Sequence, residues 1–185
     1  MKDKMVRITI SGLPGAGKNT TSKFIAKKLK LKHYSVGDFR RDLAAKKHMT
    51  IHQLNKLGEK SIWSDKIADD WQKALAKKDN FIIDGRLSWY FIPNSIKVFL
   101  KVSELEGAKR IFLERRKSEG KYKSLKQVVS ANKERVKSDI KRYKKYYKLN
   151  PYALEHYDII IDTSNLSKKQ MNNAVLKAVQ RFIGK

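Results

Sequence analysis

The chain has 185 residues, of which 41% are hydrophobic, and this length and composition are typical of one folded domain rather than of a disordered chain. It contains no cysteine, which excludes disulfides, thiolate metal sites and cysteine nucleophiles, and no apolar run approaches the roughly 18–20 residues that would span a membrane. Its 43 Lys and Arg against 18 Asp and Glu give a formal net charge of +25, which favours partners that carry negative charge.

Short apolar runs alternate with longer segments whose apolar residues recur at helical spacing. In chain order, the sequence predicts a strand at 6–11, a helix at 18–30, a strand at 33–36, mostly helix over 39–78, strands at 81–84 and 96–100, helices at 104–117 and 125–148, a strand at 158–162 and a helix at 167–183. Within 39–78 a break falls near Met49, and Thr50 is the expected N-cap of the helix that follows.

The alternation of strands and helices indicates an α/β fold. Short buried strands separated by helices predict a three-layer sandwich, with a central parallel sheet of five strands and helices on both faces. The chain has three prolines, no internal repeat and no Pro/Gly-rich linker, so we expect a single domain over residues 1–185. Ligands of such sheets bind beyond the carboxyl ends of the strands, and the motifs below follow strand ends.

A glycine-rich segment lies between the first predicted strand and the first predicted helix, which is the context of a phosphate-binding loop, or P-loop. Its glycines let backbone N–H groups point inward, and Lys18 can reach the β- and γ-phosphates of a nucleotide. A glycine-rich turn with an unrelated lysine is the alternative, and it does not account for the position between strand and helix. We expect the nucleoside triphosphate to bind Gly12, Gly15, Ala16, Gly17, Lys18, Asn19 and Thr20.

Asn19 departs from the general P-loop pattern, in which a Ser or Thr after the lysine ligates Mg²⁺ through its hydroxyl. Thr20 follows immediately. Adenylate kinases have a similar arrangement, so this segment resembles nucleoside monophosphate kinases more than GTPases or motor ATPases. The resemblance implies that Mg²⁺ is held mostly through water, with Thr20, Asp38 and Asp84 as its candidate contacts.

Two further segments place an aspartate and an arginine after predicted strands. Residues 35–41, SVGDFRR, follow the second strand, and residues 84–86, DGR, follow the third. Arginine suits a second anion site because its planar fork grips phosphate oxygens in pairs. Aspartate suits outer-shell contacts to a hydrated Mg²⁺. A kinase for a small phosphorylated acceptor needs such a second site facing its P-loop.

These segments resemble the nucleoside monophosphate kinase family, whose members carry S-x-G-D-x-x-R after strand two and an Asp-Gly pair near a phosphate-gripping arginine after strand three. In that pattern Arg41, rather than Arg40, takes the acceptor-phosphate position, with Ser35 and Asp38 beside it. Within the family, the Asp-Gly-Arg form ending at Arg86 resembles cytidylate kinases. The likeness covers nearly the whole chain and is greatest for the compact archaeal type.

A second resemblance to cytidylate kinases is an R-x-x-x-D-x-x-R set at Arg135, Asp139 and Arg142. At these spacings the three side chains lie on one face of a helix. In cytidylate kinases such a set contacts the ribose and phosphate of the acceptor. A surface ion-pair set on a charged helix is the alternative interpretation. The last predicted strand and turn, residues 157–167, also resemble those of cytidylate kinases.

The resemblance implies transfer of the γ-phosphoryl group of ATP to CMP or dCMP, with Mg²⁺, in a monomeric cytoplasmic enzyme. It implies acceptor-binding helices over about 38–78 and a short lid over about 115–125, whose arginines close over the transferring group and exclude water. The implied catalytic residues are Lys18, Arg86, Arg110, Arg115 and Arg142, with Arg116 beside them. The implied acceptor-binding residues are Ser35, Asp38, Arg41, Asp65, Asp69, Arg86, Arg135, Asp139 and Arg142.

Three alternatives stay open from the residues alone. The acceptor can be another monophosphate, such as AMP or UMP, because no base-reading side chain can be placed from sequence. The high positive charge can instead indicate a P-loop protein that associates with nucleic acid, although no RNA-binding signature is present. Scattered lysines can also be solvated helix faces with no partner.

Overall fold

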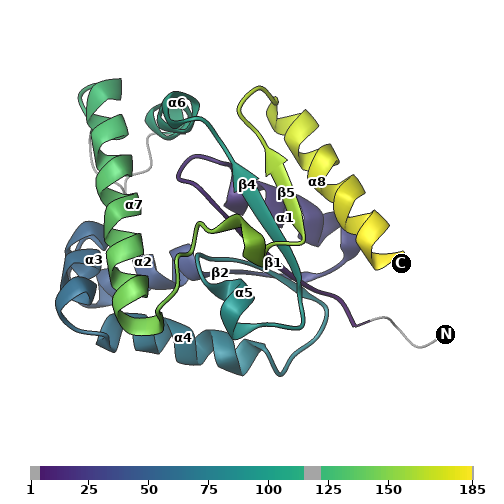
Figure 1. Ribbon diagram of the computed structural model, residues 1–185, viewed down its shortest axis with the longest axis horizontal. Coiled ribbons are helices and arrows are strands. Elements are labelled where there is room, and N and C mark those ends of the chain that lie inside the picture. The colour runs from purple at the N-terminus through teal and green to yellow at the C-terminus, as the bar shows by residue number, and fades with distance from the viewer. Residues whose placement is uncertain (1–4, 115–121, 185) are drawn as a thin grey trace.

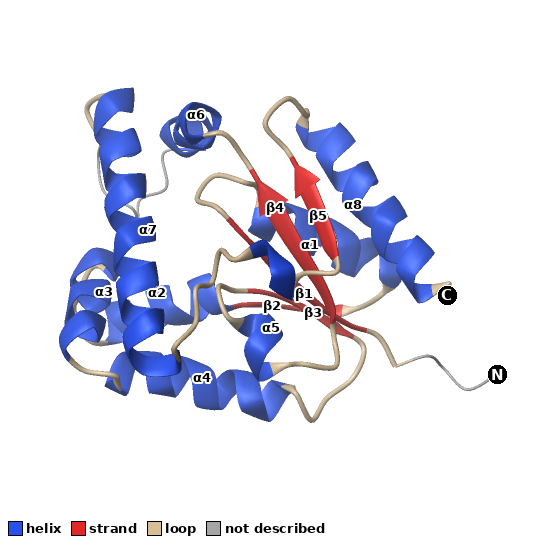
Figure 2. Ribbon diagram, in the orientation of Figure 1, coloured by secondary structure: helices blue, strands red, loops and turns tan. Residues whose placement is uncertain are grey.

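The computed structural model describes residues 5–114 and 122–184. Its centre is a parallel sheet of five strands in the order β2-β3-β1-β4-β5 (Figure 2). The strands are β1 Arg7–Gly12, β2 Lys32–Ser35, β3 Phe81–Asp84, β4 Ile96–Lys101 and β5 Ile159–Asp162. All four strand pairings are parallel, which confirms the predicted fold class.

The helices follow the predicted chain order. They are α1 Lys18–Leu29, α2 Val36–Lys46, α3 Ile51–Lys60, α4 Trp63–Leu75, α5 Ser88–Phe91, α6 Glu104–Glu114, α7 Leu125–Tyr147 and α8 Lys168–Ile183, with a short 3₁₀ turn at Leu154–His156. Thr50 caps α3 in a reciprocal arrangement with Gln53, as the sequence predicted. The sequence did not predict α5, a four-residue helix too short for periodicity to reveal. Among the described residues, no helix is long and apolar enough to cross a bilayer.

The two faces of the sheet bury separate cores because successive residues of a strand point to opposite sides. In β3, Phe81 and Ile83 belong to the core under α4 and α5. Their neighbour Ile82 belongs to the other core, under α1 and α8. All three side chains are fully buried. Figure 1 shows α1 and α8 together on one side of the sheet, away from α4, α5 and α7.

Helices α2, α3 and α4 form an arm between β2 and β3, and this arm is bonded to α7. Glu59 on α3 accepts hydrogen bonds from Ser138 Oγ at 2.7 Å and Lys141 Nζ at 3.1 Å. Tyr146 Oη donates to the carbonyl oxygen of Gly58 at 3.0 Å. At Gly58, a Cβ atom would lie 2.9 Å from Asp65 Oδ2 and 3.1 Å from Arg142 Cδ. The glycine therefore lets α3 approach α4 and α7 closely, which brings the arm to one end of the sheet.

Candidate active site

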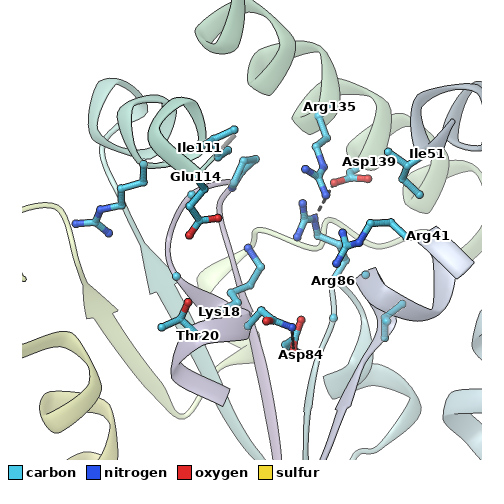
Figure 3. Close-up of a pocket in the computed structure, with 18 of the residues that line it drawn as sticks. Lys18, Thr20, Arg41, Ile51, Asp84, Arg86, Ile111, Glu114, Arg135 and Asp139 are labelled. Carbon is cyan, nitrogen blue, oxygen red and sulfur yellow. Dashed lines mark hydrogen bonds and ion pairs between the residues drawn. The ribbon is translucent and has the colours of Figure 1, made fainter. Parts of the chain in front are cut away.

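A cavity of about 490 Å³ lies where the strands end at their carboxyl termini. Its walls come from the P-loop, the arm, the end of β3, and helices α6, α7 and α8. Figure 3 shows Lys18 pointing into it from one side, and Arg41, Arg86 and Arg135 converging from the other. The structure thus brings the two predicted anion-binding segments to one cavity.

The P-loop has the backbone geometry that its sequence requires. Gly15 has a φ of 76°, and a Cβ there would lie 2.2 Å from the carbonyl oxygen of Gly107 on α6. Gly17, with φ 84°, is the residue before α1, so the first amides of α1 open toward the cavity. No side chain larger than hydrogen fits at Gly15 without displacing α6.

Lys18 lies folded back on the P-loop. Its Nζ donates to the carbonyl oxygens of Gly12 at 2.9 Å and Leu13 at 2.7 Å. Burial lowers the pKa of Lys18 well below its ordinary value, and the positive charges of Arg86 and Arg135 lower it further. The lowered pKa means that burial disfavours the protonated amine. A bound anion beside Nζ would offset this, because a nearby opposite charge favours the protonated form.

The amide of Asn19 spans two carboxylates. Its Nδ2 donates to Asp38 Oδ2 at 3.2 Å and to Asp84 Oδ2 at 3.5 Å. Asp84 also accepts from Ser35 Oγ at 2.9 Å and is paired with His33 Nε2 at 3.0 Å. The position that is usually a hydroxyl ligand in P-loops is therefore a donor between two acidic groups.

Among its described residues, this part of the cavity offers few direct protein ligands for Mg²⁺. No group of three or more His, Cys, Asp or Glu within residues 5–114 and 122–184 has the geometry to hold a metal ion directly. Thr20 and Asp84 line the cavity, and their oxygens are the donor type that Mg²⁺ prefers. Asp38 is absent from the cavity lining and is paired with Arg41. The donor set fits a hydrated ion held near Thr20 and Asp84, and fits a fully protein-ligated ion poorly.

Ser35 and Asp38 are supporting residues in this geometry, and neither lines the cavity. Ser35 is the N-cap of α2, accepting from the Asp38 amide at 3.2 Å. Burial tends to raise the pKa of Asp38, but the adjacent Arg41 guanidinium outweighs this and lowers it. The expectation that both residues touch the acceptor is not supported by their positions, whereas Arg41 lines the cavity as expected.

Asp139 is the centre of a buried cluster on the side of the cavity opposite Lys18 (Figure 3). It accepts from Arg86 Nε at 2.7 Å, from Arg142 Nη2 at 2.8 Å and from the Tyr152 hydroxyl at 2.7 Å. Burial alone would raise the pKa of Asp139, but Arg86 and Arg142 hold it far below its ordinary value. Because Arg86 uses Nε for Asp139, its two terminal nitrogens are left to face the cavity, which Arg86 lines.

Asp65 lies between two buried arginines instead of in the cavity. Its Oδ1 accepts from Arg40 Nη1 at 2.7 Å and from Arg142 Nη1 at 3.2 Å, and only 2% of the residue is exposed. Both terminal nitrogens of Arg142 are thereby committed to carboxylates. The prediction that Asp65 reads the acceptor therefore stays a prediction, since here its carboxylate faces Arg40 and Arg142. Arg142 orients Asp139 more than it offers free donors.

Asp69 is also buried behind the cluster. Its carboxylate accepts from the Tyr147 hydroxyl and from Gln72 Nε2, and it is absent from the cavity lining. Burial raises the pKa of Asp69 to about 6, although the Tyr147 hydrogen bond opposes the shift. A direct contact between Asp69 and the acceptor is therefore not supported either.

Arg110 is bonded to the segment between β5 and α8. It donates to Glu106 Oε1 at 3.0 Å, to Thr163 Oγ1 at 3.1 Å and to the carbonyl oxygens of Thr163 and Leu166 at 2.6 and 3.3 Å. It lines the cavity, but these bonds hold the loop before α8. Arg115 and Arg116, the other predicted lid arginines, lie outside the described residues.

Several residues of the site were missed, or in the case of Arg40 set aside, when only the sequence was considered. Arg40 and Asn55 line the cavity and are joined by a 3.1 Å hydrogen bond, while His33 and Tyr152 hold Asp84 and Asp139. From sequence, Arg40 was set aside in favour of Arg41, the next residue of the motif. His33 and Tyr152 carry no local signal, because their roles exist only through contacts between distant segments.

The sequence is similar to proteins named cytidylate kinase. A sequence profile described as the cytidylate kinase-like family matches residues 7–165. The cytidylate kinase of Archaeoglobus fulgidus is 36% identical over 177 residues, with 95% of both chains covered. That of Methanocaldococcus jannaschii is 34% identical over 180 residues, covering 95% of this chain and 98% of the relative.

The fold is similar to those of solved P-loop kinases. Shikimate kinase from Bacteroides thetaiotaomicron superposes with a TM-score of 0.64 at 17% identity, covering 98% of this chain and 99% of that one. The complex of Acinetobacter baumannii shikimate kinase with shikimate gives 0.62 at 13% identity, with 96% and 94% covered. At these identities the likeness concerns the fold alone.

Proposed function

Because the chain belongs to the cytidylate kinase-like family, we propose that it transfers the γ-phosphoryl group of ATP to CMP, producing ADP and CDP. The observation that carries this proposal is a single cavity with two facing anion sites. One consists of the P-loop amides and Lys18, and the other of Arg41, Arg86 and Arg135. Two phosphorylated substrates are what such a pair of sites accommodates.

The reaction needs no covalent enzyme intermediate. A phosphate oxygen of CMP attacks the γ-phosphorus of ATP, a new P–O bond forms, and the bond between that phosphorus and the β–γ bridging oxygen breaks, so that the electron pair leaves with ADP. Catalysis of this kind is mainly positioning and neutralisation of charge. Lys18 and the P-loop amides would hold the donor phosphates, while Arg41, Arg86 and Arg135 would hold the acceptor phosphate in line.

Mg²⁺, when bound, would neutralise charge on the transferring phosphates. Thr20 and Asp84 would hold its water shell, and Asn19 would keep Asp38 and Asp84 oriented. Asp139 would accept the hydrogen bond from Arg86 and so orient its guanidinium toward the phosphate of CMP. Arg142 would hold Asp139 in place.

The test is a coupled assay with ATP, Mg²⁺ and a panel of CMP, dCMP, UMP, AMP and GMP. The expected result is the highest kcat/KM with CMP or dCMP. A higher kcat/KM with AMP or UMP would reassign the acceptor but retain the kinase. Absence of transfer to every monophosphate would overturn the proposal.

A further inference from the structure

Eight exposed basic side chains that the proposed reaction does not use gather on α1, α8 and the segment that leads from α1 into β2. They are Lys23, Lys27, Lys28, Lys30, Lys32, Lys169, Lys177 and Arg181, hereafter the basic face. Helices α1 and α8 pack against each other, and Thr21 Oγ1 donates to Asn172 Oδ1 across their contact at 3.1 Å. Figure 1 shows the two helices together on one side of the sheet, away from the arm. Six of the eight cations therefore lie on two helices that contact each other, and Lys30 and Lys32 follow α1 directly.

Few of the described acidic residues lie near the basic face, and Asp38, whose charge interacts with Lys23, is at its edge. Residues 12–37 and 163–185 together contain eleven Lys and Arg and no Asp or Glu, and every acidic residue except Asp3 lies between 38 and 162. Within the described part of the chain, none of the eight cations forms an ion pair. On α7, by contrast, Lys133 and Lys141 pair with Glu104 and Glu59 at 3.2 and 3.1 Å.

Positive side chains spread over two helices suit an extended polyanion better than a small anion. It suits a membrane poorly, because peripheral helices also insert large apolar side chains. Of the large exposed apolar side chains in the described residues, Phe182 is the one on this face, at 40% exposure.

A shallow hollow at the junction of α1 and α8 places an aromatic ring and side-chain amides beside the lysines of the basic face. It is lined by Phe24, Lys168, Lys169, Asn172 and Asn173, and Lys28 Nζ lies 5.8 Å from the centre of the Phe24 ring. An aromatic ring beside cations suits an unpaired base, and the exposed amide of Asn173 suits a ribose hydroxyl.

We propose that the basic face binds single-stranded RNA through its phosphates, with the hollow at Phe24 receiving a base. The eight cations lie outside the cavity lining, so we expect RNA binding not to require the phosphoryl transfer. Lys168 lines both the cavity and the hollow and is left unchanged in the test. RNA binding would give a role to the positive charge of the basic face, which the proposed phosphoryl transfer does not use.

The test compares two triple variants of the full chain with equal net charge. The first, Lys27→Gln, Lys28→Gln and Lys177→Gln, alters the basic face. The matched control, Lys126→Gln, Lys137→Gln and Lys144→Gln, alters exposed lysines of α7. Binding of a labelled 20-nucleotide poly(U) RNA is measured by fluorescence anisotropy from about 50 to 300 mM salt, a range over which phosphate contacts weaken strongly.

We expect the basic-face variant to lose about tenfold or more in affinity and to reduce the slope of log K against log salt by about 2, while the control loses less than about threefold. Phe24→Leu should weaken binding without changing the slope. Equal losses in the two triple variants would show that only net charge matters and would overturn the proposal. Equal affinity for single-stranded DNA, or full competition by phosphatidylserine vesicles, would also overturn it.

Both triple variants should keep the kcat/KM of the unmodified chain for ATP and CMP, which verifies that they fold. If the unmodified chain phosphorylates no monophosphate, the proposed function fails while the RNA measurement stands. If it phosphorylates CMP but binds RNA no more tightly than the basic-face variant does, this inference alone fails.

Discussion

The hydroxyl of Tyr152 donates a 2.7 Å hydrogen bond to Asp139 Oδ2, the same oxygen that accepts from Arg86 Nε. The Arg86 guanidinium also lies 5.8 Å from the centre of the Tyr152 ring. Tyr152 thus contacts both members of the ion pair that aims Arg86 at the cavity. The loop that carries it is fixed by a 2.7 Å bond from Tyr157 Oη to the carbonyl oxygen of Pro151.

Tyr152→Phe removes the hydroxyl and keeps the ring. We expect the KM for CMP to rise about five- to tenfold, the cost of one typical hydrogen bond, with the KM for ATP within about twofold. Steady-state kinetics with each substrate varied in turn measures both. The control is Tyr146→Phe, which removes a hydroxyl bonded to Gly58. Equal changes in the two variants would mean that the effect is general loosening of α7.

Arg86→Lys retains the positive charge but replaces the planar guanidinium, with its several N–H donors, by a single ammonium group. Lysine cannot donate to Asp139 and present two further nitrogens to a phosphate at once. We expect the KM for CMP to rise about tenfold or more and kcat to fall, with ATP affinity little changed. Titration of ATP by calorimetry supplies the second measurement. Equal loss of ATP affinity would remove Arg86 from the acceptor site.

The fold was predictable because its signals are local. Residues 12–18 predict the P-loop, and residues 81–84 predict a buried strand. Both predictions depend only on residues that are adjacent in sequence. The predicted acceptor arginines Arg41 and Arg86 do line the cavity. The contacts of Asp65 and Asp69 were not predictable, since helical position alone cannot distinguish a carboxylate that faces the cavity from one that bonds to side chains of its own or another helix.

Asp65→Asn tests whether that residue supports the site or contacts the acceptor. The change is nearly isosteric, but it leaves Arg40 and Arg142 without their shared carboxylate in a buried place. We expect the free energy of unfolding to fall by about 3 kcal/mol, measured by urea denaturation. Glu59→Gln, which alters a carboxylate at the arm's contact with α7, should cost less than about 1 kcal/mol. A stable Asp65→Asn variant with only a raised KM for CMP would restore the direct contact predicted from sequence.

Lys18→Met keeps the length of the side chain and removes its charge. We expect kcat to fall by about 10² to 10³, because a positive group beside the transferring phosphates is lost. The melting temperature should stay equal or rise, since burial disfavours the charged amine when no nucleotide is present. Lys27→Met, on the exposed side of the same helix, should leave kcat unchanged. A kcat for Lys18→Met near that of the unmodified chain would exclude Lys18 from the phosphate site.

Asp69 gives the stability of the protein a defined pH dependence. Its pKa is about 6 in the folded protein against about 3.9 in an unfolded chain. Between these values the folded state binds the proton more tightly, so the contribution of Asp69 to stability is greatest below about pH 4 and is lost as the pH rises through about 6. Asp69→Asn has no such titration, and its amide oxygen can still accept from Tyr147.

We therefore expect the difference in unfolding free energy, Asn variant minus unmodified chain, to increase by about 2 kcal/mol from pH 4 to pH 7 and to stay constant above that. Urea denaturation at intervals of half a pH unit measures it. Asp70→Asn is the control, because Asp70 is exposed and pairs only with Lys73 among the described residues. A difference that is flat across this range, or that has the opposite sign, would mean that Asp69 is ionised in the folded protein at pH 4 and that the Tyr147 hydrogen bond outweighs its burial.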